Sequence, residues 1–164
     1  MKCPACSNEL SPVTVDGLTV DSCKDNGCGG LFFDHFQLKK VDEPTELAGD
    51  KLVELQKQEA KKTVSDEKRN CPKCDNQPMM RHFFSVKREV LVDECPGCGG
   101  MWLDAGELDK IRKEFSSDAA RETATEKYFD ETFDPSIAQF QAEEKRESVG
   151  KMGRLFKFFS RNKN

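Results

Sequence analysis

The sequence has little with which to build a large apolar core. Only 36% of its 164 residues are hydrophobic, with a single tryptophan and a single tyrosine, while 34% are charged. No apolar run is long enough to span a bilayer, and no apolar segment precedes the first thiol at Cys3. We therefore expect an intracellular, cytoplasmic protein. Its twelve phenylalanines still need burial, so the composition does not favour a disordered chain.

What the sequence does contain is eight cysteines in two similar groups of four. Paired CxxC motifs in a cytoplasmic chain favour metal binding over disulfide bonds. Four thiolates complete the tetrahedral shell of a structural zinc site, so we predict two Zn²⁺ ions, one in each group. The predicted ligands are Cys3, Cys6, Cys23 and Cys28 for one ion and Cys71, Cys74, Cys95 and Cys98 for the other.

The donor set leaves other chemistry open. Iron accepts the same four thiolates, and unligated thiols can be reduced or paired as disulfides. A module of about 40 residues has too little core to fold without a metal or another staple, which favours the metal-bound state. Zinc-bound thiolates can also be oxidised and released, so a redox role remains an alternative.

The two cysteine groups belong to an internal repeat. Segment 29–41 aligns with segment 99–111, and the aligned pair Phe32 and Trp102 keeps its aromatic character. After the last Cys-Gly-Gly of each copy we expect a short helix. The sequence therefore predicts two copies of one module.

Between its paired thiols each copy has the pattern of a β-hairpin. Segment 13–21 alternates apolar and polar residues around Asp16-Gly17, which is the signal for a type I′ turn. Segment 80–94 has β-branched and aromatic residues, with a longer turn expected near 85–88.

The fold prediction is a small, metal-stabilised α+β protein in which two zinc ribbons are joined by a helical linker and followed by helices. The linker spaces Ala48, Leu52 and Leu55 along one helix face. We expect a helix over 117–130 and another after Asp134-Pro135. The predicted boundaries are 1–43 and 71–113 for the ribbons, 44–70 for the linker, 114–148 for a helical region and 149–164 for a basic amphipathic helix.

The second copy resembles the bacterial zinc-ribbon family named after the zinc finger of transcription factor IIB. That family's signature reads approximately CPxC, a hairpin, then CPxCGGxWLDxGEL. The resemblance covers about half of the chain and implies one zinc ion per ribbon and an association with transcription or nucleic acid. The matching residues are Cys71, Cys74, Cys95, Cys98, Gly99, Gly100, Trp102, Leu103, Asp104, Gly106, Glu107 and Leu108. The first copy departs from the signature at its expanded knuckle 23–28 and at Phe32, His35, Phe36 and Gln37.

Asp104 and Glu107 have the spacing of a capping box at a helix start, where Asp104 accepts from an early amide and Glu107 reaches back. The first copy has Gln37 in place of Glu107, and an amide cannot serve as an acid. We therefore favour capping over acid–base catalysis. His35 and His82 are expected at the surface or beside the metal sites, because each site already has four sulfurs.

The net charge of −4 disfavours nonspecific nucleic-acid binding over the whole surface, and each four-thiolate zinc centre adds about −2. The last helix pairs an apolar stripe with basic side chains, so it suits an anionic membrane, RNA, an acidic groove of a partner, or the protein's own helices. The candidate contact residues are Arg81, Lys87 and Arg88 on the second hairpin and Lys151, Arg154, Lys157 and Arg161 in the last helix.

We predict a noncatalytic adaptor that binds a protein partner, with nucleic acid in transcription as a further possibility. Closed four-thiolate sites leave no open position for substrate or water, which argues against an enzyme. A zinc-thiolate redox sensor or a thiol-dependent chaperone is the alternative. The sequence identifies neither the partner nor the oligomeric state.

Overall fold

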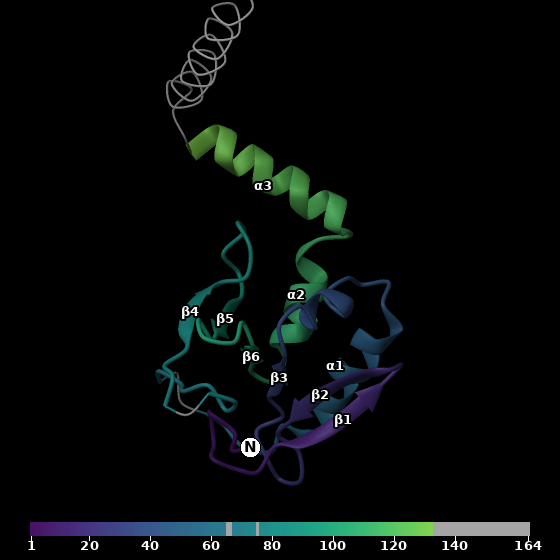
Figure 1. The fold of residues 1–164 in the computed structure, drawn as a ribbon. Coiled ribbons are helices and arrows are strands. Elements are labelled where there is room, and N and C mark those ends of the chain that lie inside the picture. The colour runs from purple at the N-terminus through teal and green to yellow at the C-terminus, as the bar shows by residue number, and fades with distance from the viewer. Residues whose placement is uncertain (65–66, 75, 133–164) are drawn as a thin grey trace, which may run out of the picture. The chain divides into compact units, whose positions relative to one another are not determined.

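The structure is a computed structural model that describes residues 1–64, 67–74 and 76–132 (Figure 1). The chain divides into two units, Met1–Glu122 and Thr123–Asn164. Both predicted zinc ribbons lie in the first unit, together with the predicted linker.

A single antiparallel sheet of six strands contains the hairpins of both copies. Its strand order is β1-β2-β3-β6-β5-β4, so each copy contributes three strands and the two copies meet at its centre. From each edge to the centre, the strands are the first, second and third of one copy, so an approximate twofold axis relates the two copies. The strands are β1 Ser11–Val15, β2 Leu18–Ser22, β3 Leu31–Phe33, β4 Met80–Phe83, β5 Leu91–Glu94 and β6 Met101–Leu103.

Both predicted hairpins are confirmed. Asp16 and Gly17 link β1 to β2 with φ angles of 47° and 82°, as a type I′ turn requires. The longer turn between β4 and β5 is closed where the Phe84 amide donates to the Val90 carbonyl at 2.8 Å.

A short helix follows each Cys-Gly-Gly, as predicted, but a third strand that was not predicted comes first. β3 and β6 are short runs of large apolar residues, and they pair with each other so that Phe32 stands opposite Trp102. Helical turns begin only afterwards, at the 3₁₀ helix η1 (Leu38–Lys40) and at α2 (Glu107–Glu114). β3 and β6 pair with each other across the junction of the two copies, so each of these short strands depends on the other copy for a hydrogen-bonded partner.

The central strands separate two apolar clusters. Leu31, Phe33 and Leu103 belong to a cluster that also includes side chains of helices α1 and α2. Phe32 and Trp102 belong to a second cluster, which includes five of the cysteines and against which the other three pack. This division follows from the period of two along a strand, which turns alternate side chains to opposite faces. The metal-binding cysteines therefore share one cluster with the junction of the two copies.

The predicted linker helix is present as α1 (Leu47–Glu59). Its buried residues include Leu52, Val53 and Gln56, while Ala48 and Leu55 pack at the edge of the core. The apolar stripe is thus close to the predicted one, displaced toward Val53.

One buried guanidinium ties α2 to the segment around the start of α1. Arg112 donates to the carbonyl oxygens of Val41, Pro44 and Glu46 at 2.6, 3.2 and 3.1 Å, and to the Asp50 carboxylate at 2.8 Å. These carbonyls lie between the first copy and the helix, so the second copy holds the linker in place.

The helix predicted over 117–130 is present as α3 (Asp118–Thr132). Among the described residues, no helix has the length and apolarity that crossing a membrane requires. The helices predicted after Pro135 and over 149–164 lie outside the described residues.

Candidate metal centres

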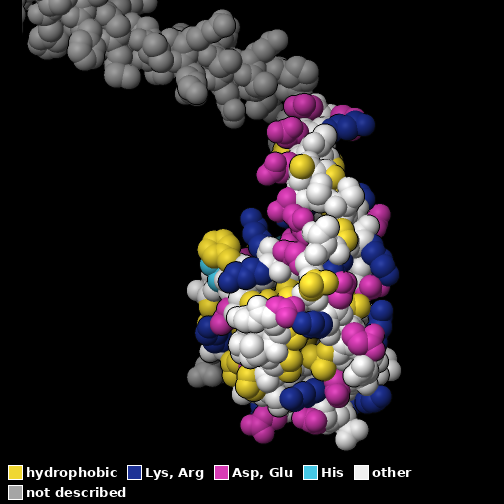
Figure 2. Space-filling view, turned by 90° about the vertical axis from the view of Figure 1, so that its right-hand side faces the viewer, with side chains coloured by type: hydrophobic (Ala, Val, Ile, Leu, Met, Phe, Trp, Pro, Cys, Tyr) yellow, Lys and Arg dark blue, Asp and Glu magenta, His cyan; other side chains and the backbone are white. Residues whose placement is uncertain are grey.

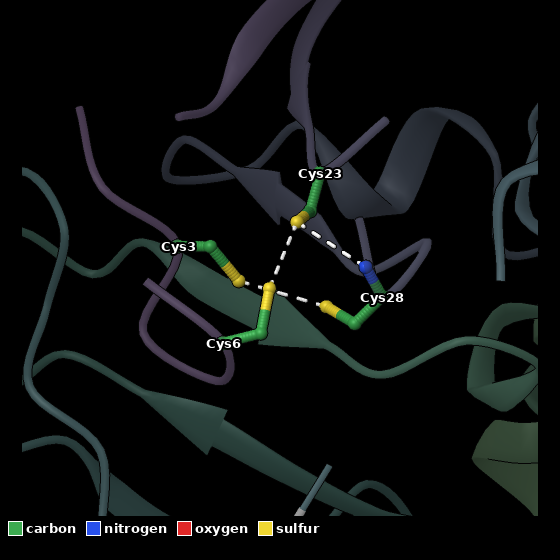
Figure 3. Close-up of side chains that lie close together, drawn as sticks. All are labelled: Cys3, Cys6, Cys23 and Cys28. Atoms are coloured by element: carbon green, nitrogen blue, oxygen red, sulfur yellow. Dashed lines mark hydrogen bonds between the residues drawn. The ribbon is translucent and has the colours of Figure 1, made fainter. Parts of the chain in front are cut away.

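The first four-cysteine set converges from three segments of the first copy (Figure 3). Cys3 and Cys6 come from the N-terminal knuckle, Cys23 directly follows β2, and Cys28 precedes β3. The Sγ atoms of Cys3 and Cys28 are 3.6 Å apart, and those of Cys6 and Cys23 are 3.4 Å apart. A tetrahedral zinc with bonds of about 2.3 Å separates its sulfurs by about 3.8 Å, so these distances fit the ion.

The expanded knuckle of the first copy still places Cys28 beside the other three cysteines of its set. Asp25 and Asn26 take positive φ angles of 55° and 67°, which places the turn one residue earlier than the expected Asn26-Gly27. A Cβ on Gly27 would lie 2.4 Å from the Cys23 carbonyl oxygen, so only glycine fits there. The Cys28 amide then donates to the Cys23 sulfur at 3.4 Å.

The second set has the same construction in the second copy. The sulfurs of Cys71 and Cys98 are 3.7 Å apart, and in both sets all four sulfurs lie within 4.8 Å of one another. Gly99 has a φ of 68° and donates its amide to the Cys95 carbonyl at 2.8 Å. Gly29 donates its amide to the Cys23 carbonyl at 2.9 Å, so the corresponding bond also closes the longer knuckle of the first copy.

Hydrogen bonds and burial shift the pKa values of the thiols in opposite directions. The hydrogen bond with Cys28 and burial both raise the pKa of Cys3, and the same bond lowers the pKa of Cys28 to about 6. Burial raises the pKa of Cys71 to about 12, while at Cys95 burial is outweighed by backbone N–H groups that hold its pKa below the ordinary value. Thiolates in such a set attract a dication, whose binding releases the remaining protons.

Each set can therefore hold one zinc ion. Four buried or half-buried thiolates complete a tetrahedral shell, which is the arrangement of structural rather than catalytic zinc. Zinc bound there supplies the cross-link that closes each knuckle against its hairpin.

The central aromatic residues do more than fill the core of their own copies. Trp102 and Phe32 are 0% and 1% exposed, so neither ring is free to contact a partner. A Cβ on Gly30 would lie 2.1 Å from Cζ2 of Trp102, and one on Gly100 would lie 2.4 Å from Cζ of Phe32. Each aromatic residue packs on the knuckle glycine of the other copy.

The capping prediction is half right. The Glu107 carboxylate accepts the Asp104 amide at 2.7 Å, and Gln37 accepts the Asp34 amide at 2.8 Å in the first copy. The carboxylate of Asp104, however, makes no cap to α2. It accepts from the Arg69 guanidinium at 2.5 and 2.7 Å and from the Trp102 indole at 2.9 Å.

Arg69 is the residue of this cluster that sequence reasoning missed. It is 3% exposed, and its Nε lies 3.6 Å from the Asp93 carboxylate as well as binding Asp104. Its position two residues before Cys71 carries no signal, because its partners are distant in the sequence. A buried guanidinium held by two carboxylates ties the start of the second copy to β5 and to the residue after β6.

Basic side chains of the cluster predicted on the second hairpin bind other residues of the same chain. Arg81 binds the Asp93 carboxylate through two contacts of 3.0 Å. Lys87 donates to the Glu114 carbonyl and lies 4.3 Å from the centre of the Phe115 ring, while Arg88 is exposed. The other candidate contacts, Lys151, Arg154, Lys157 and Arg161, lie outside the described residues.

The two histidines occupy different surroundings. His35 is exposed, with Nδ1 3.4 Å from the Gly99 carbonyl oxygen beside the second metal set. His82 is half-buried and lies 2.9 Å from the Glu94 carboxylate. Within the described residues, neither belongs to a group of side chains that could hold a metal ion.

Comparison with known protein families matches the chain to the family described as transcription factor zinc-finger, of the zinc-ribbon type named after transcription factor IIB. The match covers residues 2–43 and 70–114, which are just over half of the chain and coincide with the two copies. No curated protein and no solved structure gave a significant match. The chain therefore belongs to the transcription factor zinc-finger family and carries two of its zinc ribbons, joined in one sheet.

Proposed function

We propose that this protein is a noncatalytic adaptor that uses its zinc ribbons as a scaffold to bind a protein partner. The observation that carries the proposal is the closed geometry of both cysteine sets, which leaves substrate no coordination position on the ions. Function then depends on the surfaces that the scaffold displays. The description of the family suggests that the partner acts in transcription.

The exposed side chains favour protein over nucleic acid. Figure 2 shows basic and acidic side chains interspersed over the face in view, without a continuous basic tract. Mixed charge of this kind attracts phosphate backbones weakly. Large apolar side chains, in contrast, are exposed at several places among the described residues, namely Met1, Phe36, Leu47, Met80, Phe83, Leu91 and Phe129.

The adaptor proposal is tested by affinity purification with the zinc-loaded full chain from a cytoplasmic extract, followed by reconstitution with the purified partner. We expect a one-to-one complex that Cys23→Ser and Cys95→Ser both lose, because each removes a ligand that shapes the scaffold. A chain that binds DNA or RNA with a steep salt dependence and retains no protein would overturn the proposal.

A redox sensor gives a different result in the same material. If the protein is a redox sensor, dilute peroxide should oxidise the thiolates reversibly to disulfides and release zinc. If it is an adaptor, its complex with the partner should stay intact at the same peroxide concentration. Partner binding that requires the oxidised chain would therefore count against the adaptor.

A further inference from the structure

A groove with a largely apolar lining lies where the two copies meet. Its volume is about 310 Å³, at the lower end of the range of roughly 300–1,000 Å³ for ligand pockets. Leu38 comes from the first copy, Phe84 and Met101 from the second, and Arg121 from the start of α3. The groove thus exists only because β3 and β6 bring the copies together.

Phe36 lines this groove in a strained and exposed state. Its φ is +64°, a left-handed conformation that bulky residues rarely adopt, and its side chain is 67% exposed. The second copy has Gly106 at the aligned position, with a φ of +88°. Glycine would hold the first copy's backbone without strain, so what phenylalanine adds is its ring, whose centre lies 3.6 Å from that of the His35 ring and which is otherwise exposed. An exposed aromatic ring kept at such a position is what contact with a partner would require.

The lining of the groove includes a buried acceptor that is unsatisfied among the described residues. Asp42 is 5% exposed, and its Oδ2 accepts from Arg121 at 2.5 Å. Its Oδ1 is buried and has no hydrogen-bond partner among the described residues. A buried acceptor of this kind favours a ligand that brings an N–H donor. Asp34 and Glu94 also line the groove, so its titratable lining has three carboxylates against two cationic side chains, Lys39 and Arg121, and the imidazole of His35.

We infer that this groove binds a segment of a partner protein in which an apolar side chain stands next to a lysine or arginine. The inference rests on the proposed adaptor function and names its binding surface. The apolar side chain packs between Phe36 and the floor formed by Leu38, Phe84 and Met101, and the basic group donates to Asp42 Oδ1. A phosphate-bearing ligand would meet these carboxylates and be repelled.

The test is fluorescence anisotropy with the zinc-loaded full chain and a short labelled peptide that alternates leucine and phenylalanine with lysine. We expect saturable binding, and at least about tenfold weaker binding when glutamate replaces each lysine. Phe36→Gly should weaken binding about tenfold while raising the urea midpoint, because it relieves the backbone strain. Asp42→Asn, checked for zinc content and folding, should also weaken binding of the basic peptide.

Leu47→Ala is the matched control, since Leu47 is 72% exposed and does not line the groove. It should bind the peptide as the wild type does. No binding by the wild type, equal binding of the glutamate peptide, or unchanged binding by Phe36→Gly would each overturn the inference.

Affinity purification separates failure of the groove from failure of the adaptor function. If the wild type and Phe36→Gly retain the same protein equally, the adaptor function stands and the groove is not its binding surface. If the wild type retains no protein, the adaptor function fails whatever the peptide does.

Discussion

The indole of Trp102 lies against Gly30, in space that a larger residue at position 30 would occupy. Phe32 has the same relationship to Gly100. Each knuckle glycine therefore accepts the aromatic residue of the other copy, directly beside the cysteines of its own metal set. The pairing of β3 with β6 and the closure of the metal sites are parts of one packing arrangement.

Replacing Gly30 by alanine should disrupt this arrangement. The added Cβ would lie 2.1 Å from Trp102, which is too close for either the ring or the backbone to keep its place. Overpacking of this kind destabilises a protein by about 1–3 kcal/mol. Urea unfolding of the zinc-loaded chain measures the loss in the free energy of unfolding.

Gly97→Ala is the control for the alanine substitution itself. Its Cβ would be 3.7 Å from its nearest neighbour, an ordinary contact, so we expect a change within about 0.5 kcal/mol. If both substitutions lower the free energy of unfolding equally, the packing of Trp102 does not require a glycine at position 30.

Because Trp102 is the single tryptophan, its fluorescence reports on both copies. Cys23→Ser removes one ligand of the first metal set, which should loosen the knuckle that carries Gly30. We expect the Trp102 emission to shift to longer wavelength as water reaches the ring, although Trp102 belongs to the second copy. An emission spectrum identical to that of the wild type would show that the two copies fold independently.

Glu107 should make stability depend on pH. Burial raises its pKa to about 7, above the value of about 4.3 expected in the unfolded chain. Between these values the folded chain keeps a proton that the unfolded chain has lost, so this group lowers the free energy of unfolding as pH rises. The side chain keeps some contact with water, which reduces the size of the effect.

Glu107→Gln should remove this dependence, because glutamine can still accept the Asp104 amide, as Gln37 accepts that of Asp34. At about pH 8 we expect the variant to be more stable than the wild type by about 1–3 kcal/mol, and at about pH 5 the difference should be small. Urea midpoints in excess zinc at both pH values provide the measurement. A difference that is the same at both would rule out the titration of Glu107 as its cause.

The sequence predicted features that depend on residues near one another in the chain. The turn at Asp16-Gly17 follows from local backbone preference, and the cysteine sets follow from spacing and from the repeat. The strands β3 and β6 were missed because three apolar residues are too short a run to indicate a strand without a partner. That partner lies in the other copy, and no periodicity in the sequence indicates the pairing.

The same limit applies to the buried ion pairs. Arg69 and Asp104 are brought together by the fold, and a cap was the better local interpretation of Asp104. Phe36 is different, because the repeat aligns it with Gly106. The alignment of this phenylalanine with a glycine indicates a residue with a positive φ angle, which strains the backbone of a phenylalanine.

Native mass spectrometry of the full chain, purified with its metal, tests the account most directly. It should show two zinc ions per chain, and one fewer for Cys23→Ser and for Cys95→Ser. The masses also distinguish zinc from iron. A folded wild-type chain with one metal ion or none, or with iron in place of zinc, would contradict the account.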